Sequence, residues 1–377
     1  MPSRSDWAEL AKQTFHAVDR EDVADLYQVE WRQAADALIA EHLDAIQAER
    51  KAWKRWIRKA NAVLYGLSRR LSPTRRILLA AALALGMLGG IEFRSESEGR
   101  TKLVHIDMHF ISVGILTLLL CMELVDKVQF KDELLLARDL QADLLPKVLP
   151  DVEGYEIGAH NRIANTVGGD LYDFEVLEDG RLVVLFGDAS GHGMTAGLVM
   201  AVSHAAFLTQ IDIDPSPGAI LTTLNRILCR TGACRTAGPR QFFAGIALTL
   251  ERDGRFSAMV AGHPPILKLD AQGRVVERFG RGSYPVGVKA GVTWPLLTGT
   301  LAPGETLLFH SDGLPDCPNI HGEEFGDERI LRVIERRVGA SASELVGALS
   351  SSLSEFLGRR PPEDDVSIAA IRRRTLL

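Results

Sequence analysis

The sequence predicts an α+β fold in which a layered domain of strands and helices follows a helical N-terminal region. After Pro150, short alternating apolar runs separated by glycine and Asp-Gly turns indicate strands joined by hairpins. The helical stretches of this part are gathered in blocks, which favours sheets covered by helices over a parallel sheet. Before Pro150, two long apolar runs indicate a membrane hairpin. With 377 residues, of which 46% are hydrophobic, the chain can form one large globular domain and an accessory region.

Residues 1–76 are expected to form a helical cytosolic region that ends in a basic segment next to the membrane. The region is rich in Ala, Leu, Glu and Lys and has no glycine before Gly66. Residues 50–76 hold ten Lys or Arg and no acidic residue, although the whole chain has a formal net charge of −6. Trp53 and Trp56 stand among these cations, a combination that is typical of a membrane lipid surface. Nucleic acid is the alternative partner, but no nucleic-acid-binding motif is present.

Residues 77–122 are predicted to form two short hydrophobic helices joined by an external loop. Apolar runs cover residues 77–91 and 110–122, and each needs flanking residues to reach the ~20 residues that cross a bilayer. A buried hairpin of a soluble domain is the alternative. The cations before the first run place both large terminal parts in the cytosol, on the inner side of the membrane. The four cysteines form neither a disulfide framework nor a zinc pattern, so we expect reduced thiols.

Residues 123–150 are predicted to form an amphipathic linker helix. The stretch ELVDKVQFKDELLLARDLQADLL contains no glycine or proline, and Pro146 and Pro150 end it. A four-and-three spacing over about two heptads relates Phe130, Leu134, Ala137, Gln141 and Leu144. Two interpretations remain open: a dimerising signalling helix that makes the chain a homodimer, or a helix packed on its own domain.

Residues 151–377 contain acidic positions that share one local design, an Asp at the end of a predicted strand beside a glycine or another acid. These positions are Asp170, Asp188, Asp312, Asp364 and Asp365. Any one alone is typical of a turn. Several carboxylates brought together repel one another unless a divalent cation neutralises them. With no Cys or His at ligand spacing, the oxygen donors favour Mg²⁺ or Mn²⁺.

A site of this kind predicts a reaction class. Two such ions about 4 Å apart would lower the pKa of a bridging water and hold the oxygens of a phosphoryl group during in-line attack. We therefore expect phosphate ester hydrolysis without a protein nucleophile. His192, within the stretch GDASGHG, is a candidate general acid for the leaving group; a histidine that packs or caps the turn is the alternative.

Eight motifs, in order, carry a resemblance to a known family. They are ARDLQADLLP, GGDLYDF, FGDASGHGMTAGLVMA, AGHPP, YPVGV, FHSDGLPD, EEFGDERI and EDDVSIA. Their order and spacing resemble the bacterial PPM-type (PP2C-like) serine/threonine phosphatases of the stage II sporulation protein E and sigma-regulator phosphatase group. The resemblance spans residues 137–372. It implies an αββα sandwich of two antiparallel sheets flanked by helices, with the phosphatase domain at 151–377.

The resemblance also implies roles for individual residues. Asp170 resembles the first metal ligand, Asp188 the bridging ligand, and the Ala189 backbone carbonyl a further donor. Asp312 resembles the ligand of the second metal ion, while Asp364 and Asp365 share the final acidic position. The implied substrates are phosphoserine or phosphothreonine proteins, often anti-anti-sigma factors of the STAS type in partner-switching pathways.

Departures from the family pattern are small. His310 and Ser311 stand where relatives more often have Tyr and Thr, and Ala189 stands where Val is more usual. None of these changes removes an implied ligand, so an active enzyme is expected. The competing interpretation within the same fold is a catalytically weak, membrane-tethered scaffold or binding module. A trypsin-like site at Ser190 is disfavoured because the GDSGG order is missing.

Overall fold

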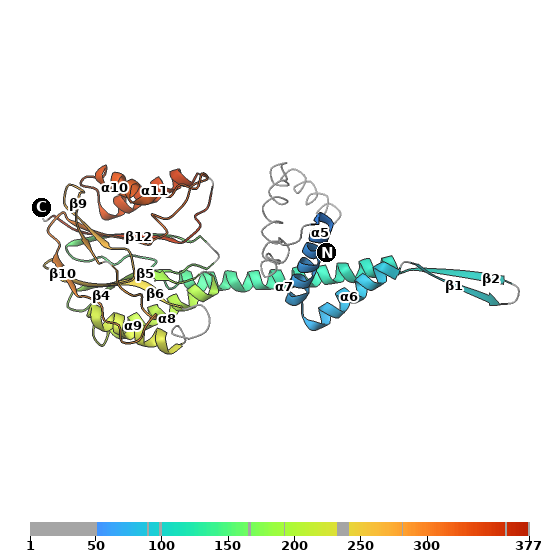
Figure 1. The fold of residues 1–377 in the computed structure, drawn as a ribbon. Helices are drawn as coiled ribbons and strands as arrows, with labels where there is room; N and C mark the ends of the chain where they lie inside the picture. The colour runs from blue at the N-terminus through green and yellow to red at the C-terminus, as the bar shows by residue number, and fades with distance from the viewer. Residues whose placement is uncertain are drawn as a thin grey trace, which may run out of the picture. The chain divides into compact units, whose positions relative to one another are not determined.

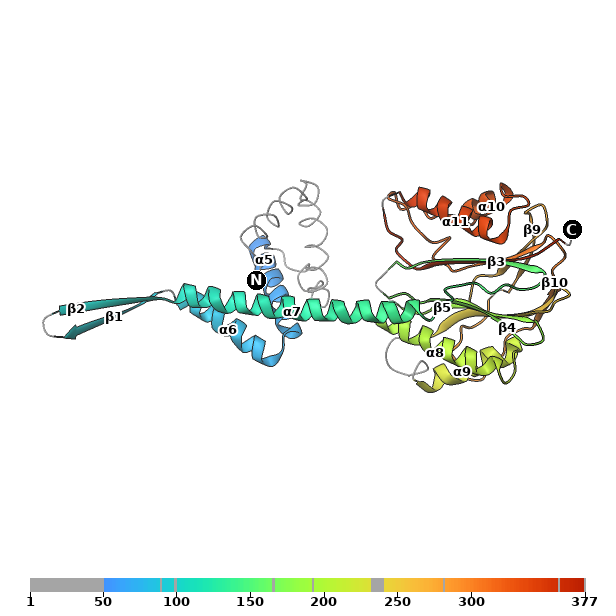
Figure 2. The ribbon, with the colours of Figure 1, turned by 180° about the vertical axis from the view of Figure 1, so that it is seen from behind.

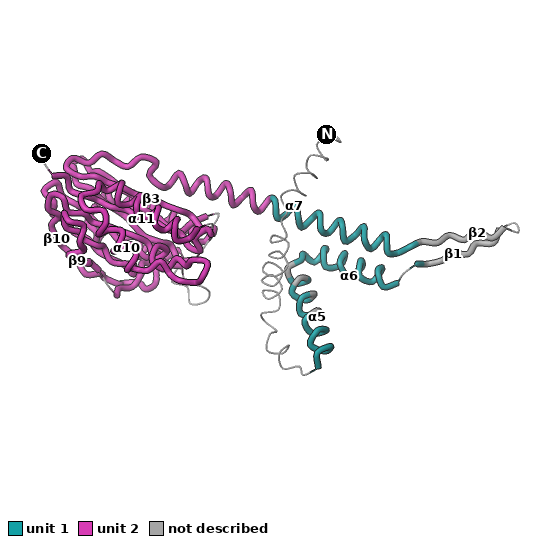
Figure 3. Tube along the Cα trace, turned by 90° about the horizontal axis from the view of Figure 1, so that it is seen from above, with its two compact units in different colours: residues 1–128 teal, residues 129–377 magenta. Residues whose placement is uncertain are grey.

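The structure is a computed structural model that describes residues 51–375 apart from 89, 98–99, 165–166, 192, 232–240, 281 and 359. The chain divides into two compact units, residues 1–128 and 129–377 (Figure 3). The predictions for residues 1–50 lie outside the described residues.

The first unit contains three described helices and one hairpin. They are α5 (Ala52–Arg70), α6 (Pro73–Leu88), β1 (Gly90–Ser97), β2 (Arg100–Asp107) and the first part of α7 (Met108–Ala142). Ser112 of α7 donates its hydroxyl hydrogen bond to the Ala82 carbonyl of α6 over 2.7 Å, and a Cβ at Gly86 would lie 3.1 Å from the same hydroxyl oxygen. Small residues thus let α6 and α7 pack closely.

The segment between α6 and α7 is an antiparallel β-hairpin, where the sequence predicted only a loop. Its register runs from Gly90 opposite Asp107 to Ser97 opposite Arg100. Apolar and polar residues alternate over residues 91–94 (IEFR) and 104–107 (VHID), and such alternation is typical of β-structure. These alternating stretches are short, so the sequence analysis identified only the two longer apolar runs beside them.

Helix α7 is continuous across the expected boundary between residues 122 and 123. The second hydrophobic segment and the linker helix are therefore parts of one 35-residue helix. By length and composition alone, α7 and α8 (Met194–Ile211) are the candidate membrane spans among the described residues. Helix α8 has Val199, Met200 and Phe207 buried in the second unit, so it is a core helix. Helix α6 has 16 residues, fewer than the ~20 that cross a bilayer.

The second unit is a sandwich of two five-stranded antiparallel sheets with helices on both outer faces (Figures 1 and 2). The first sheet has the order β10-β7-β6-β5-β4 and the second β3-β12-β11-β8-β9. Their bounds are β3 (Tyr155–Arg162), β4 (Asp170–Val176), β5 (Leu182–Ala189), β6 (Phe243–Leu250), β7 (Arg255–Ala261), β8 (Ile266–Leu269), β9 (Val275–Phe279), β10 (Leu297–Thr300), β11 (Thr306–His310) and β12 (Val366–Arg373). Helices α8 and α9 (Pro217–Thr231) cover the first sheet, and α10 (Gly326–Glu335) and α11 (Ala342–Leu357) cover the second. The predicted α+β class and αββα layering are confirmed.

The position of strand β5 inside the sandwich is the reason for the continuous apolar run before Asp188. Side chains alternate between the faces of a strand. Leu182, Val184 and Phe186 therefore join the core between the two sheets, while Val183 and Leu185 join the core beneath α8 and α9. Both faces of β5 are buried, so both residue sets are apolar. A third core fills the space between the second sheet and α10–α11.

The structure of the second unit shows where the end of the predicted linker helix packs. Gln141, near the end of α7, is 4% exposed, and Leu144 packs against the core beneath α8, whereas Phe130 is 62% exposed. The last turn of the predicted linker helix thus packs on its own domain.

Cys229 of α9 takes part in a disulfide bond, so the expectation of reduced thiols is wrong at this position. Spacing that excludes a zinc site does not exclude a disulfide bond.

Candidate metal centre

Two of the predicted ligands face each other across one pair of antiparallel strands. Asp170 begins β4, Asp188 lies one residue before the end of β5, and the register pairs these two residues directly. Asp170 is 2% exposed and Asp188 is half-buried. Directly paired residues have Cβ atoms about 5 Å apart. The fold therefore brings two carboxylates together that are 18 residues apart in the sequence.

The second sheet supplies the other acidic residues. Asp312 follows β11, and Asp364 and Asp365 precede β12, the neighbour of β11. Asp365 is buried and accepts hydrogen bonds from the backbone N–H groups of Ala164 (2.8 Å) and Gly169 (2.6 Å). Asp312 and Asp364 are exposed to solvent. Asp365 therefore acts as a tie between the two sheets, while Asp312 and Asp364 are accessible to an ion.

Ser311 joins the two halves of the site. Its hydroxyl donates to Asp170 Oδ2 over 3.0 Å and accepts from the backbone N–H of Ser367 over 3.0 Å. Ser311 and Ser367 are completely buried. A hydroxyl held in this way orients the Asp170 carboxylate toward the gap between the sheets. The resemblance treated Ser311 only as a conservative replacement of Thr, and the sequence carried no signal of this contact.

The electrostatics of the site disfavour negative charge in the absence of a cation. Burial raises the pKa of Asp170 to about 8, with a further increase from Asp365 and Asp312 and an opposing effect of the Ser367 and Ser311 hydroxyls. Burial raises the pKa of Asp188 to about 9, followed by repulsion from Asp170 and from the three acids of the second sheet. The predicted carboxylates thus affect one another, as expected for groups that a cation would neutralise.

Glycines leave the space in which the carboxylate and carbonyl oxygens approach one another. A Cβ at Gly169 would lie 2.7 Å from both Asp188 Oδ1 and the Ala189 carbonyl oxygen. A Cβ at Gly168 would lie 2.5 Å from Asp365 Oδ2. Real Cβ atoms do not approach oxygen so closely, so any larger residue would displace these donors. The GG pair before Asp170 is therefore required by the site.

The donor set fits a hard divalent cation. All the side-chain donors are carboxylate oxygens, and the Ala189 carbonyl oxygen and Asp188 Oδ1 face the same side of Gly169. An open pocket of about 340 Å³ is lined by Asp312, Asp364 and two further acids, Asp316 and Glu363. Among the described residues, no three His, Cys, Asp or Glu side chains lie close enough together to hold a metal ion as they stand. Asp312 and Asp364 are exposed, so their side chains are not held by packing.

His192 lies outside the described residues. The structure therefore gives no position for the candidate general acid.

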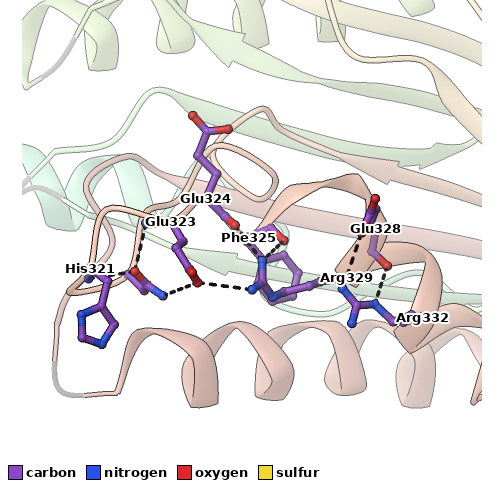
Figure 4. Close-up of polar contacts among 8 residues, drawn as sticks. His321, Glu323, Glu324, Phe325, Glu328, Arg329 and Arg332 are labelled. Atoms are coloured by element: carbon purple, nitrogen blue, oxygen red, sulfur yellow. Dashed lines mark hydrogen bonds and ion pairs between the residues drawn. The ribbon is translucent and has the colours of Figure 1, made fainter.

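The loop after Asp312 is fixed by its own polar contacts (Figure 4). The Asn319 side-chain oxygen accepts from the backbone N–H groups of His321 and Glu323 at 2.8 and 3.0 Å. The Arg329 guanidinium lies 3.5 Å from the Glu323 carboxylate and donates to the Phe325 carbonyl at the start of α10. These contacts hold the segment between the pocket and α10 in a defined turn.

Gln141 clamps the backbone beside the metal centre, a role that the heptad interpretation missed. Its side-chain oxygen accepts from the Gly168 N–H over 2.9 Å, and its amide nitrogen donates to the Gly168 carbonyl over 2.5 Å. The same nitrogen lies 2.9 Å from the Met200 sulfur of α8. The last turn of α7 is thus connected to the residue two positions before Asp170.

Replacing Gln141 with leucine is expected to leave the buried N–H of Gly168 without an acceptor. Loss of one such hydrogen bond costs about 1.4 kcal/mol, which corresponds to about tenfold faster amide exchange. Hydrogen exchange read by mass spectrometry on a peptide that covers Gly168 measures the change. The Gln129→Leu variant, on an exposed turn of the same helix, is the control. Unchanged exchange in the Gln141 variant would contradict the clamp.

A second missed feature is a buried histidine in the AGHPP motif. The His263 ring packs at a right angle to Phe186 with 5.4 Å between ring centroids, and its Nε2 has no hydrogen-bond partner within the described part of the chain. Burial lowers the pKa of His263 to about 3, against an ordinary value near 6.5, and His310 adds to this effect. The histidine is therefore neutral in the folded protein.

His263 is expected to make the fold less stable as the pH falls below 6.5. Between pH 6.5 and about 3 the unfolded chain binds a proton at this position and the folded chain does not, so each pH unit costs up to about 1.4 kcal/mol of unfolding free energy. Denaturant unfolding of the wild type and of His263→Phe at pH 7, 6 and 5 tests this. The stability difference between the two proteins should shift in favour of the variant as the pH falls, and a constant difference would refute the assignment.

Comparison with known proteins now decides the family. The model of the family described as stage II sporulation protein E (SpoIIE) matches residues 178–374, slightly more than half of the chain. The chain belongs to the SpoIIE family. The match covers strand β5 with Asp188 and all three acids of the second sheet. The predicted membership of the bacterial PPM-type, SpoIIE-like group is confirmed.

The chain matches only part of each of two curated relatives. Protein IcfG of Synechocystis sp. is 25% identical over 267 residues, which cover 64% of this chain and 41% of IcfG. Phosphoserine phosphatase RsbU of Bacillus subtilis is 24% identical over 247 residues, which cover 65% of this chain and 71% of RsbU. The chain thus spans less than half of IcfG.

A solved structure shares the SpoIIE-type fold. The SiaA-PP2C domain of Pseudomonas aeruginosa superposes with a TM-score of 0.56 at 21% identity, covering 66% of this chain and 98% of that domain. The likeness supports the fold class, a PP2C-like sandwich.

Proposed function

We propose that this SpoIIE-family chain is a metal-dependent protein phosphatase that hydrolyses phosphoserine or phosphothreonine. The observation that carries the proposal is the direct pairing of Asp170 with Asp188 at the edge of the sandwich where Asp312, Asp364 and Asp365 also lie. Carboxylates that disfavour their own ionisation are suited to neutralisation by Mg²⁺ or Mn²⁺. The name of the relative RsbU, a phosphoserine phosphatase, supports the substrate class.

In the proposed reaction, the residues of the site would have separate roles in binding the cations and the substrate. Asp170, Asp188 and Asp312, with the Ala189 carbonyl, would hold two cations, and Asp364 or Asp365 would complete the set. Once bound, the cations would supply an activated water and the positive charge needed to attack a phosphoryl group. Ser311 would keep the Asp170 carboxylate oriented, and the open, acidic pocket would give a phosphorylated loop of a protein access to the site.

The proposed substrate is a signalling protein, with a STAS-type anti-anti-sigma factor as the first candidate. Helix α7 supports a membrane location, because it is long, apolar in its first half and largely exposed there. We further propose residues 1–76 as a cytosolic region, 77–122 as the membrane segment and 151–377 as the phosphatase domain in the cytosol, with a homodimer formed through residues 123–150.

Removing divalent cations is expected to abolish activity. The full chain in detergent is assayed with p-nitrophenyl phosphate in Mn²⁺, in Mg²⁺ and after chelation. Turnover should require a cation and return when the cation is restored. A folded chain that binds Mn²⁺ by calorimetry but shows no turnover, with either the aryl phosphate or a phosphorylated STAS protein, would favour the scaffold alternative.

A further inference from the structure

We propose that one face of α5 binds an anionic lipid surface, with the helix lying in the plane of that surface. The face consists of Trp53, Trp56 and Ile57, whose side chains are 61%, 71% and 43% exposed. Within the described part of the chain, the Lys54 ammonium lies over the Trp53 ring, 5.7 Å from its centroid, and leaves that ring mostly exposed. Exposure of two tryptophans and an isoleucine to water is unfavourable. Indole rings are favoured at the boundary between an apolar and a polar region.

The arrangement of charge on α5 is complementary to such a surface. With 3.6 residues per turn, Trp53, Trp56 and Ile57 fall on one face, because they are spaced by three and four residues. The exposed cations Lys54 and Lys59 fall beside this face, and Arg55 and Arg58 fall opposite it. Helix α5 contains no acidic residue. A helix with a narrow apolar face and cations on the remaining sides is typical of anionic membrane interfaces.

Contacts within the first unit fix the direction of α5. Arg76 of α6 donates to the carbonyls of Leu71 (2.9 Å) and Arg69 (3.0 Å) at the end of α5. The adjacent Arg75 donates to Glu123 (2.7 Å) and Asp126 (2.6 Å) of α7. Helix α5 runs across the direction of α7 in all three ribbon and tube views (Figure 3). If α7 crosses the bilayer as proposed, α5 lies along the membrane surface. The residues that form the exposed face of α5 are the same whether or not α7 crosses the bilayer.

Other occupants fit this face less well. Nucleic acid would satisfy the cations but leave the tryptophan pair and Ile57 in water. A second copy of α5 would cover the apolar residues but bring two sets of like charges together. An anionic bilayer satisfies both the apolar face and the cations.

Fluorescence quenching in lipid nanodiscs tests the proposal on the full chain. Brominated acyl chains quench tryptophans that enter the apolar region, and the discs contain either phosphatidylglycerol mixed with phosphatidylcholine or phosphatidylcholine alone. The wild type is compared with Trp53→Ser/Trp56→Ser, with Lys54→Gln/Lys59→Gln and with the control Trp294→Phe, whose tryptophan is buried in the second unit. Circular dichroism checks that each variant is folded.

We expect strong bromolipid quenching of the wild type in anionic discs, most of it lost in Trp53→Ser/Trp56→Ser and retained in Trp294→Phe. The quenching should weaken in neutral discs and in Lys54→Gln/Lys59→Gln. Equal quenching in the wild type and Trp53→Ser/Trp56→Ser, or no dependence on lipid charge, would overturn the proposal. So would a signal from Trp53 and Trp56 that responds to added duplex DNA or to self-association in detergent but not to lipid. The result is independent of aryl phosphate turnover, which tests the proposed phosphatase separately.

Discussion

Asp188→Asn is expected to remove turnover and to stabilise the metal-free protein. The amide cannot replace a carboxylate ligand, and loss of about 4 kcal/mol of charge stabilisation in the transition state lowers kcat about 10³-fold. The pKa of Asp188 is raised to about 9, so between pH 3.8 and 9 the folded state holds a proton that the unfolded state releases. Asp188 therefore makes stability fall as the pH rises through this window, and the neutral amide removes this contribution, while that of Asp170 remains.

The measurement combines steady-state kinetics in Mn²⁺ with thermal unfolding in chelator at pH 6, 7 and 8. Asp253→Asn, at an exposed turn where the carboxylate pairs with Arg255, is the matched control and should change neither quantity appreciably. An Asp188→Asn protein that keeps activity would remove this residue from the metal centre. A variant that is less stable than the wild type in chelator would show that the site is not repulsive when metal-free.

Phe186→Ala is expected to cost about 3–5 kcal/mol of unfolding free energy, the usual range for a buried aromatic residue. Phe186 is completely buried between the sheets, two residues before Asp188. Its ring centroid lies 5.8 Å from that of Phe309 in the other sheet and 6.5 Å from that of Tyr172. Truncation leaves a cavity where β5 and β11 meet, directly beneath the candidate metal centre.

Denaturant unfolding of Phe186→Ala and Phe186→Leu measures this contribution. The leucine variant keeps most of the apolar volume and should lose considerably less stability than the alanine variant. Similar, small losses in both would indicate that the sandwich collapses around the cavity. In that case Phe186 is not a rigid contact between the sheets.

The carboxylates could be predicted because each carries a local signal. Asp170 and Asp188 follow or precede apolar strand residues beside glycine, and antiparallel pairing of neighbouring strands then brings them together. The αββα layers could be predicted because β5 and β12 are apolar on both faces, which requires cover on both sides of each sheet. The resemblance added the roles of Ala189 and of the acids in the second sheet; those roles stay proposals.

The remaining features depend on contacts that leave no pattern in the sequence. Ser311 reaches Asp170 across 141 positions, and Gln141 reaches Gly168 across 27. A glutamine at a heptad-like position is equally compatible with a partner helix and with its own domain, and only the tertiary fold decides. The junction near residue 122 was expected to divide two segments because the composition changes there. A change from apolar to amphipathic composition marks a change of surroundings, and with no proline or glycine present it does not end a helix.

The tie between Asp365 and Gly169 spans 196 positions, and it has a consequence for biosynthesis. Protein synthesis releases the strands in order, so β4 and β5 leave the ribosome long before β12. A nascent or prematurely terminated chain that lacks β12 has the first pair of carboxylates but neither the Asp365 tie nor the backbone of Ser367 that positions Ser311. Such a chain cannot complete the candidate centre, so truncated products would not act on the substrates of the finished protein.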